Sequence, residues 1–259
     1  MRGPDAADYL QRMVSNDVEA LAPGASCEAL LLTPKARVIA PLLVLRRAGD
    51  DFLLLTEPEL AEAVRAQLVR MRFAANVSVD LEEHASYVLL GGERPEGAAA
   101  AATGDYGEPG WEVLDAAEPA DVERLPDADL ELLRIQAGTP RFGREIDDRV
   151  LPAEAGLVDR AVSFTKGCYP GQEPIARLHY RGHVNRGLRV LLLDGGELPG
   201  YDAEVVLDGK AVGRVTSSTR RPEGGIVALA YVRREVPPEA ELRVGQSVAT
   251  QLHLASGRP

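Results

Sequence analysis

Hydrophobic residues recur at helical spacing in some segments of the chain and form short runs in others. Residues 5–21 carry apolar side chains three and four positions apart, which is typical of an amphipathic helix, and Asn16-Asp17 marks its end or a turn. Glu57-Pro58-Glu59 predicts the start of a second helix that reaches about residue 72, and Asp127 is the predicted cap of a third that ends at Gly138. Runs rich in β-forming residues predict strands at 27–33, 38–45, 52–56, 77–81, 86–90 and 111–114.

The pattern weakens in the middle of the chain and changes after Gly187. Residues 91–110 are predicted to be a variable loop or linker, because an alanine run lies among Gly, Pro and Glu, and residues 139–165 are predicted to be irregular. Short apolar runs between glycine or proline turns predict strands at 188–193, 204–207, 210–217, 226–231 and 241–244. We therefore predict an α+β fold, with a body over residues 1–183 and a β-rich C-terminal domain over 184–259, which is a small β-barrel or a sandwich.

Composition narrows the classes of partner. The chain has 259 residues and a net charge of −11, so we expect no direct nucleic-acid or membrane partner, although residues 177–186 are locally basic. No apolar run approaches the roughly 18–20 residues needed to span a bilayer. Only two cysteines are present, which favours a reduced cytoplasmic protein over a Cys27–Cys168 disulfide.

Lys166-Gly167-Cys168-Tyr169-Pro170-Gly171-Gln172-Glu173 is the segment richest in candidate chemistry. Cys168 follows a lysine and precedes a basic stretch, and positive charge favours a reactive thiolate; the alternative is a buried, inert thiol. A thiolate can bind iron, attack a disulfide or accept a one-carbon unit, and the sequence does not choose among these. Cys27 lies in a β-rich run and is expected to pack in the core.

The neighbours of Cys168 have structural as well as functional interpretations. Gly167 and Gly171 let the backbone bend, and Tyr169 either stacks on a flat ligand or packs. Gln172 and Glu173 either cap the helix predicted to begin at Pro174 or take part in catalysis.

Metal binding is a further possibility at this segment. Cys168, His179 and His183 offer three possible metal ligands, but Cys-x-x-Cys and His-Glu-x-x-His motifs are absent, so we expect no permanently bound metal.

The octet resembles the signature of the YgfZ family, folate-binding proteins related to the T-protein of glycine cleavage. Arg134-Ile135-x-Ala137-Gly138-x-Pro140 and Val212-Gly213-x-Val215-Thr216 are similar to segments that the two groups share. The resemblance implies a GcvT/YgfZ-like ring of three subdomains with folate at its centre. It also implies that the second subdomain, approximately 46–120, interrupts the first. Relatives usually carry another strand before Gly3; its absence would leave a sheet edge open or reflect a misassigned start codon.

The resemblance also implies roles for particular residues. Tetrahydrofolate or a derivative would be the cofactor, and Cys168 and Lys166 the catalytic residues. The implied folate-binding residues are Gln136, Arg177, Arg181 and Tyr169; the first stands where relatives typically have a pterin-binding glutamate. Arg177 and Arg181 suit the carboxylates of a folate tail, or form a solvated basic face.

Departures from the T-protein pattern favour one activity over another. T-protein relatives carry two aspartates, one of them catalytic, where this chain has Ala40-Pro41, neither of which can titrate. We therefore expect a folate-dependent accessory protein for assembly or repair of iron–sulfur enzymes, with client proteins as partners and indirect effects on tRNA modification. The alternatives are a folate-dependent aminomethyltransferase and a non-catalytic folate binder.

Overall fold

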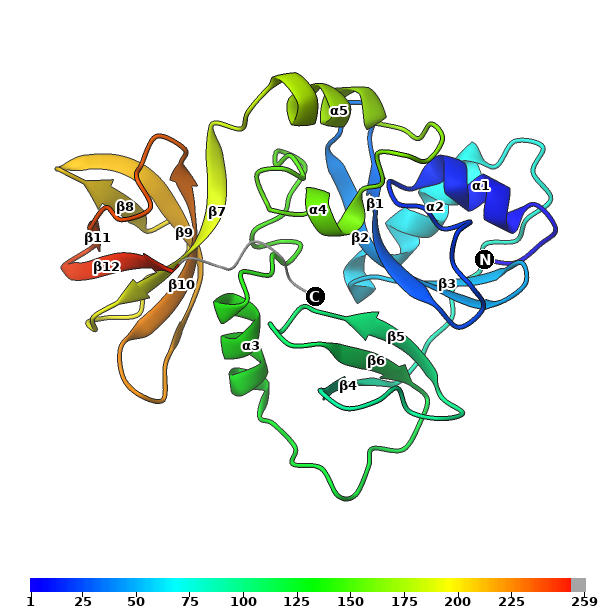
Figure 1. Ribbon diagram of the computed structural model, residues 1–259, viewed down its shortest axis with the longest axis horizontal. Coiled ribbons are helices and arrows are strands. Elements are labelled where there is room, and N and C mark those ends of the chain that lie inside the picture. Colours follow the sequence, from blue (N-terminus) through cyan, green and yellow to red (C-terminus); the bar gives the residue numbers. More distant parts are fainter. Residues whose placement is uncertain (253–259) are drawn as a thin grey trace.

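The computed structural model describes residues 1–252, in which three sheets surround a common centre (Figure 1). The helices are α1 (Ala6–Met13), the 3₁₀ helix η1 (Pro58–Leu60), α2 (Ala61–Met71), α3 (Asp127–Gln136), α4 (Val158–Ala161) and α5 (Gln172–Arg181). The strands of the first two sheets are β1 (Ser26–Leu32), β2 (Val38–Ala48), β3 (Asp51–Leu55), β4 (Ser86–Leu90), β5 (Ala99–Thr103) and β6 (Gly110–Leu114). The remaining strands are β7 (Arg186–Leu193), β8 (Glu204–Leu207), β9 (Lys210–Arg220), β10 (Ile226–Arg233), β11 (Leu242–Val244) and β12 (Ser247–Leu252).

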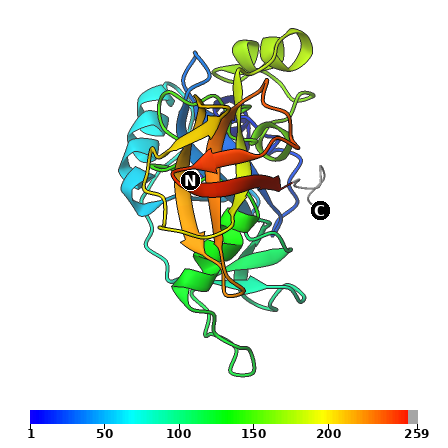
Figure 2. The same ribbon diagram turned by 90° about the vertical axis from the view of Figure 1, so that its left-hand side faces the viewer.

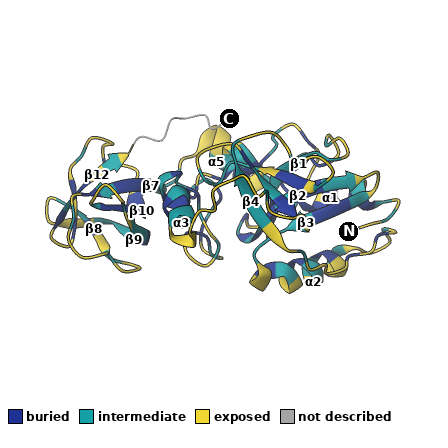
Figure 3. Ribbon diagram, turned by 90° about the horizontal axis from the view of Figure 1, so that it is seen from below, coloured by how far each residue is buried: buried dark blue, intermediate teal, exposed yellow. Residues whose placement is uncertain are grey.

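The first sheet has the antiparallel order β1-β2-β3 and packs against α1 and α2. Residues along β2 alternate between buried and half-buried, as expected for a strand with one face on a core. Tyr9 and Leu10 of α1 join Leu68 of α2 in this core, and the Tyr9 hydroxyl donates to the Leu68 carbonyl at 2.6 Å. Figure 3 shows the exposed side of α2 turned away from the sheet.

The predicted helix over residues 5–21 is shorter in the structure. It ends at Met13 because the next side chains bond to other parts of the backbone. The buried Ser15 hydroxyl donates to the Ala161 carbonyl at 2.5 Å and accepts from the Leu30 amide at 2.8 Å. The Asn16 amide donates to the Glu28 carbonyl at 2.7 Å. These bonds hold the chain after α1 across β1 and α4.

The second sheet has the order β4-β6-β5 and corrects the prediction of a linker. The alanine run forms β5, and Ala100 and Ala101 are fully buried. Alanine has a low strand propensity, so the close packing against β6 and the first sheet overrides the local preference. The strand predicted at 77–81 is also wrong: Ser78 forms an isolated bridge with Arg2, while Val77 and Val79 are buried in the first core.

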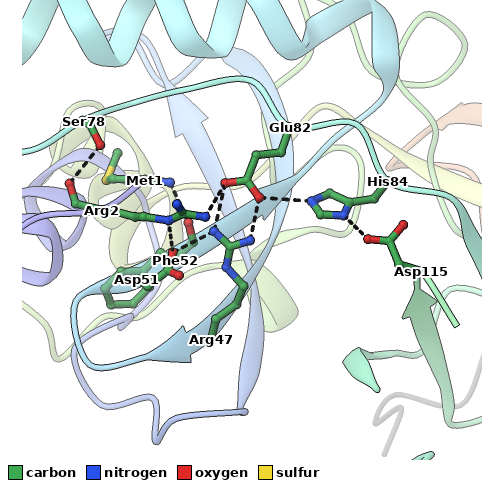
Figure 4. A network of polar contacts seen from close by, with 9 residues as sticks. All are labelled: Met1, Arg2, Arg47, Asp51, Phe52, Ser78, Glu82, His84 and Asp115. Carbon is green, nitrogen blue, oxygen red and sulfur yellow. Dashed lines mark hydrogen bonds and ion pairs between the residues drawn. The ribbon is translucent and has the colours of Figure 1, made fainter. Parts of the chain in front are cut away.

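A polar network ties the first sheet to the segment that leads into β4 (Figure 4). Arg47 of β2 donates to Glu82 at 2.6 Å and to Asp51 at 2.7 Å. His84 contacts Asp115 at 2.5 Å and Glu82 at 3.2 Å. The hydrogen bond with Asp115, followed by that with Glu82, raises the pKa of His84 despite partial desolvation.

The edge of β3 is covered by the first residues of the chain. The Met1 amino group donates to the Phe52 carbonyl at 2.8 Å, and the Phe52 amide donates back to the Met1 carbonyl at 2.9 Å. The backbone of Arg2 forms antiparallel β-bridges with both Asp51 and Ser78. The open edge that the resemblance suggested is therefore occupied at β3.

A closed barrel with the strand order β10-β7-β12-β11-β8-β9 forms the third part (Figure 2). Its interior is filled by apolar side chains of every strand. The five predicted strands are confirmed, and β12, which the sequence did not predict, pairs with both β7 and β11. On the outside of the barrel, Leu132 and Ile135 of α3 pack against β7 and β10. The α+β class, the three-part ring and the small C-terminal barrel are thus confirmed; residues 253–259 lie outside the described part.

Candidate functional site

A cavity of about 320 Å³ lies at the centre, where the first sheet, the second sheet and the segment 139–161 meet. β1 and β2 provide one wall, the β5–β6 connection and Glu112 of β6 provide the opposite wall, and Arg160 of α4 lies between them. A second hollow of about 440 Å³ shares Glu57, Asp105 and Tyr106 with this cavity and extends along α3. The two adjoining spaces have the size usual for small-molecule sites, roughly 300–1,000 Å³.

Carboxylates dominate the charged side chains of the cavity. Among residues 1–252, the acids Glu28, Glu57, Asp105 and Glu112 line it together with a single cation, Arg160. The Arg160 guanidinium donates to both carboxylate oxygens of Glu28 at 2.5 Å and also binds Asp105, so it joins β1 to the β5–β6 connection. Two of the four carboxylates are therefore paired with Arg160, whose single positive charge offsets only one of their two negative charges.

The other two acids face different surroundings. Burial raises the pKa of Glu112, and a hydrogen bond with Ser86 opposes that rise. One carboxylate oxygen of Glu57 accepts a hydrogen bond from the Phe142 amide at 3.3 Å, and the other lies 3.3 Å from the Thr56 hydroxyl. Both acids thus retain acceptor capacity toward the cavity, where a ligand with N–H donors would find complementary groups.

Pro41 of β2 also lines the cavity, while its neighbour Ala40 is fully buried. The Pro41 carbonyl accepts a hydrogen bond from the Thr56 hydroxyl at 2.9 Å, which holds the start of the next segment against β2. The position where the resemblance predicts aspartates thus presents an apolar ring to the centre. A proton transfer at this place would need another group.

Lys166 anchors the octet to the end of α1. Its ammonium donates to the carbonyls of Val14 at 2.6 Å and Asn16 at 3.0 Å, and also to that of Gln11. A cation is favourable at a helix C-terminus, where carbonyls lack partners within the helix. Burial lowers the pKa of Lys166 to about 8. The structure therefore gives this residue a positioning role; its bonds go to α1 and not to Cys168.

Cys168 lies on the surface between two buried anchors. Its side chain is exposed, whereas Lys166 and Tyr169 are buried. Tyr169 packs in a core with Leu32 and Ile175, with the Lys166 ammonium 5.1 Å from its ring centre, and burial raises its pKa to about 12. Of the two interpretations of Tyr169, the structure shows packing. Cys27 is half-buried against the first core, as expected, and burial raises its pKa to about 12.

Gly171 fixes the start of α5. It adopts φ +86°, and an added Cβ would lie 2.7 Å from the Thr33 carbonyl oxygen, so the backbone packs closely on the β1–β2 turn. The helix begins at Gln172, and Gly171 is its N-cap with no side-chain cap. Capping by Gln172 and Glu173 is therefore a wrong prediction, although Glu173 in the first turn suits the helix dipole.

None of the predicted folate-binding residues lines the central cavity in the part of the chain that the structure describes. Gln136 is the half-buried last residue of α3, and Arg177 and Arg181 of α5 line a separate groove. His179 stacks on Phe164 with ring centres 4.1 Å apart. Within residues 1–252, no three His, Cys, Asp or Glu side chains form a possible metal site.

Sequence reasoning missed the residues that do line the centre. Glu28, Asp105, Tyr106 and Arg160 come from a strand, a loop that was taken for a linker and a stretch predicted to be irregular. Asp105-Tyr106 between Gly104 and Gly107 is a turn signal, and it was the one local hint that strands flank this position.

The geometry defines a ring-shaped protein of three parts, with a cavity where the first two sheets meet the segment 139–161. No protein-family model matches the sequence. A solved structure of the glycine cleavage system aminomethyltransferase T from Bartonella henselae superimposes with a TM-score of 0.82 at 23% identity, covering 98% of this chain and 81% of that one. This likeness establishes the fold.

Two curated relatives extend the likeness to the sequence. The chain is 28% identical to an aminomethyltransferase of Rubrobacter xylanophilus, over 93% of this chain and 73% of the relative. It is 29% identical to the tRNA-modifying protein YgfZ of Edwardsiella ictaluri, over 98% of this chain and 87% of the relative. By sequence the chain is thus similar both to a YgfZ protein and to an aminomethyltransferase, and by fold to an aminomethyltransferase.

No helix in residues 1–252 combines the length and the apolar character needed to cross a membrane.

Proposed function

We propose that this protein binds tetrahydrofolate or a derivative in the central cavity and serves iron–sulfur enzymes as a cytoplasmic accessory protein through Cys168. Its likeness to a protein named for tRNA modification supports an indirect effect on that process. The observation that carries the proposal is the carboxylate-lined central cavity in which Pro41 replaces a titratable group. The division into a body (1–183, with a second subdomain at about 46–120) and a C-terminal domain (184–259) is part of the same proposal.

The cavity suits a reduced pterin. The 2-amino group and the adjacent ring N–H of a pterin are two parallel donors, which match the two oxygens of a carboxylate. Glu28 and Asp105 already bind Arg160, so Glu57 and Glu112 are the carboxylates that would hold the pterin. Tetrahydrofolate would supply a carrier for one-carbon units when bound. Glu57 and Glu112 replace Gln136, Arg177, Arg181 and Tyr169 as the proposed folate-binding residues, because none of the latter four lines the cavity.

Cys168 is proposed to act on client proteins from the surface. Its exposed thiol lies in a loop fixed on one side by Lys166 and on the other by Tyr169 and Gly171. A surface position suits contact with a sulfur or iron atom of a second protein, since a macromolecular client cannot enter a cavity of about 320 Å³.

Aminomethyl transfer is the competing function, because relatives of this chain carry that name. The apolar Pro41 at the cavity wall speaks against it. We expect no methylene transfer from a lipoyl-bound aminomethyl intermediate to tetrahydrofolate with the purified protein, and measurable turnover would overturn the preference.

The test is calorimetric titration with tetrahydrofolate, combined with complementation of a cell lacking its own YgfZ. E57Q and E112Q are expected to weaken folate binding by about tenfold, since a neutral amide cannot replace an anionic acceptor. C168A should bind folate like wild type and fail to restore the activity of an iron–sulfur enzyme. Unchanged affinity in both Gln variants would refute the folate site, and full rescue by C168A would refute the thiol's role.

A further inference from the structure

A groove of about 810 Å³ lies between α5, the β1–β2 turn and residues 151–159. It shares no lining residue with the central cavity. Ala36 and Ile175 at the groove pack in the same hydrophobic cluster as Leu30 and Leu157 at the cavity, so an apolar layer separates the two spaces. A ligand in the groove would therefore occupy a site of its own.

The groove is positively charged in a protein whose net charge is −11. In the part of the chain that the structure describes, Lys35, Arg37, Arg177 and Arg181 line it, against one carboxylate, Asp159. Among the described residues, no carboxylate pairs with Lys35, Arg177 or Arg181, and Arg37 donates to a backbone carbonyl. Clustered cations without internal partners attract an anionic ligand, and such attraction is strongest in a concave site.

The floor of the groove is apolar. Half-buried or buried aliphatic side chains from three segments form it: Leu151, Pro152, Val158, Ile175, Leu178 and Val184. Aliphatic side chains of a bound peptide would bury surface here at roughly 25 cal/mol per Å². A phosphodiester backbone offers no such surface, so the combination favours an acidic polypeptide over a nucleic acid.

We infer that this groove is a docking site for an acidic segment of a partner protein, with aliphatic residues between its carboxylates. Arg177 and Arg181 bind the carboxylates, and the floor receives the aliphatic side chains. α5 begins four residues after Cys168, a stretch that spans at most about 14 Å. A partner held on α5 is thus brought near the exposed thiol. The docking itself does not depend on folate binding or on the thiol's proposed chemistry.

The experiment measures fluorescence anisotropy with a short, fluorescein-labelled peptide that alternates glutamate with leucine. R177E/R181E should raise the Kd at least tenfold, because two attractive contacts become repulsive. The matched control R234E/R243E changes the same charge at exposed barrel positions and should stay within twofold of wild type. L178A should weaken binding about threefold or more, and circular dichroism must show that all variants remain folded.

Several outcomes would overturn the inference. The first is that R177E/R181E binds the peptide within twofold of wild type. The second is that R234E/R243E loses as much affinity as R177E/R181E. The third is that a peptide with lysine in place of glutamate binds wild type as tightly as the acidic peptide. Tighter binding of a single-stranded RNA, lost in R177E/R181E, would assign the groove to nucleic acid instead. Displacement of the peptide by pteroyl-polyglutamate but not by an acidic α-linked peptide would assign it to a folate tail. E57Q should lose affinity for folate and still bind the peptide like wild type. The failure of the folate proposal can therefore be distinguished from the failure of the docking proposal.

Discussion

Arg134 offers the sharpest test of how the ring is held together. It donates to Glu131 within α3 at 2.7 and 2.8 Å, to the Thr139 carbonyl at 2.6 Å, to Glu145 at 3.2 Å and to the Ser217 hydroxyl of β9 at 3.0 Å. The Glu145 side chain is fully buried. One guanidinium therefore connects α3, the cavity segment and the barrel.

Replacing Arg134 by methionine preserves most of the volume and removes the charge. The Glu145 carboxylate then keeps the Ser217 hydroxyl at 2.7 Å and the Arg141 amide at 3.0 Å as donors, but no cation. Leaving one partner of a buried ion pair uncompensated typically costs about 3–5 kcal/mol. Glu131 is about one-third exposed and returns to water, so it adds little. We expect R134M to lower the free energy of unfolding by about 3–5 kcal/mol.

Urea unfolding followed by Trp111 fluorescence and by far-UV circular dichroism measures this loss, and coincidence of the two curves shows whether the parts unfold together. The double variant R134M/E145Q removes the stranded charge, and we expect a coupling of about 1–3 kcal/mol in its favour. R141M is the control, since this exposed arginine lies 3.8 Å from Glu131 and should cost less than about 0.5 kcal/mol.

A cost below about 1 kcal/mol for R134M would refute the reasoning. So would a coupling energy near zero in the cycle of R134M, E145Q and the double variant, because the penalty would then not arise from the buried carboxylate.

Three further predictions concern other anchors of the fold. The pKa of His84 is higher in the folded protein than in the unfolded chain. Its contacts with two carboxylates therefore stabilise the protein fully below about pH 6.5, the pKa of unfolded histidine. This contribution is lost as the pH rises through the folded pKa. The difference in Tm between wild type and H84Q should therefore shrink as the pH is raised above the pKa of unfolded histidine. A difference that stays constant with pH would contradict the linkage. G171A should lower the free energy of unfolding in urea by about 1–3 kcal/mol, because φ is +86° and the added Cβ would meet backbone atoms. G167A is the control, since a Cβ there meets nothing within 4 Å. Equal costs for the two variants would be incompatible with this account. K166M leaves three carbonyls without their donor and should lower the free energy of unfolding by about 1–3 kcal/mol in the same measurement. C168A changes an exposed side chain and should stay within about 0.5 kcal/mol of wild type. The reverse order would assign the structural role to the thiol.

The polypeptide pattern alone determined much of the architecture. Helical spacing around Tyr9 and Leu10 located α1, and the β-rich run over 38–45 located β2. Short strands after Gly187 indicated a barrel or a sandwich, and the structure shows the closed barrel, in which the strands leave no open edge. The octet directed attention to Cys168, and the structure places that thiol at the surface.

Tertiary structure alone decided which side chains share a site. Ala100 and Ala101 carry no strong strand preference, and only packing between two sheets makes them a strand that brings Asp105 to the centre. Lys166 lies two residues from Cys168 in sequence, yet its ammonium bonds to the carbonyls of Gln11 in α1 and of Val14 and Asn16 just after it, because carbonyls at a helix end lack partners within the helix. Arg160 and Glu28 are far apart along the chain and meet only when α4 packs on β1. Sequence patterns report the burial of each element, whereas a site depends on the distances between elements, and those are set by the packing of the whole ring.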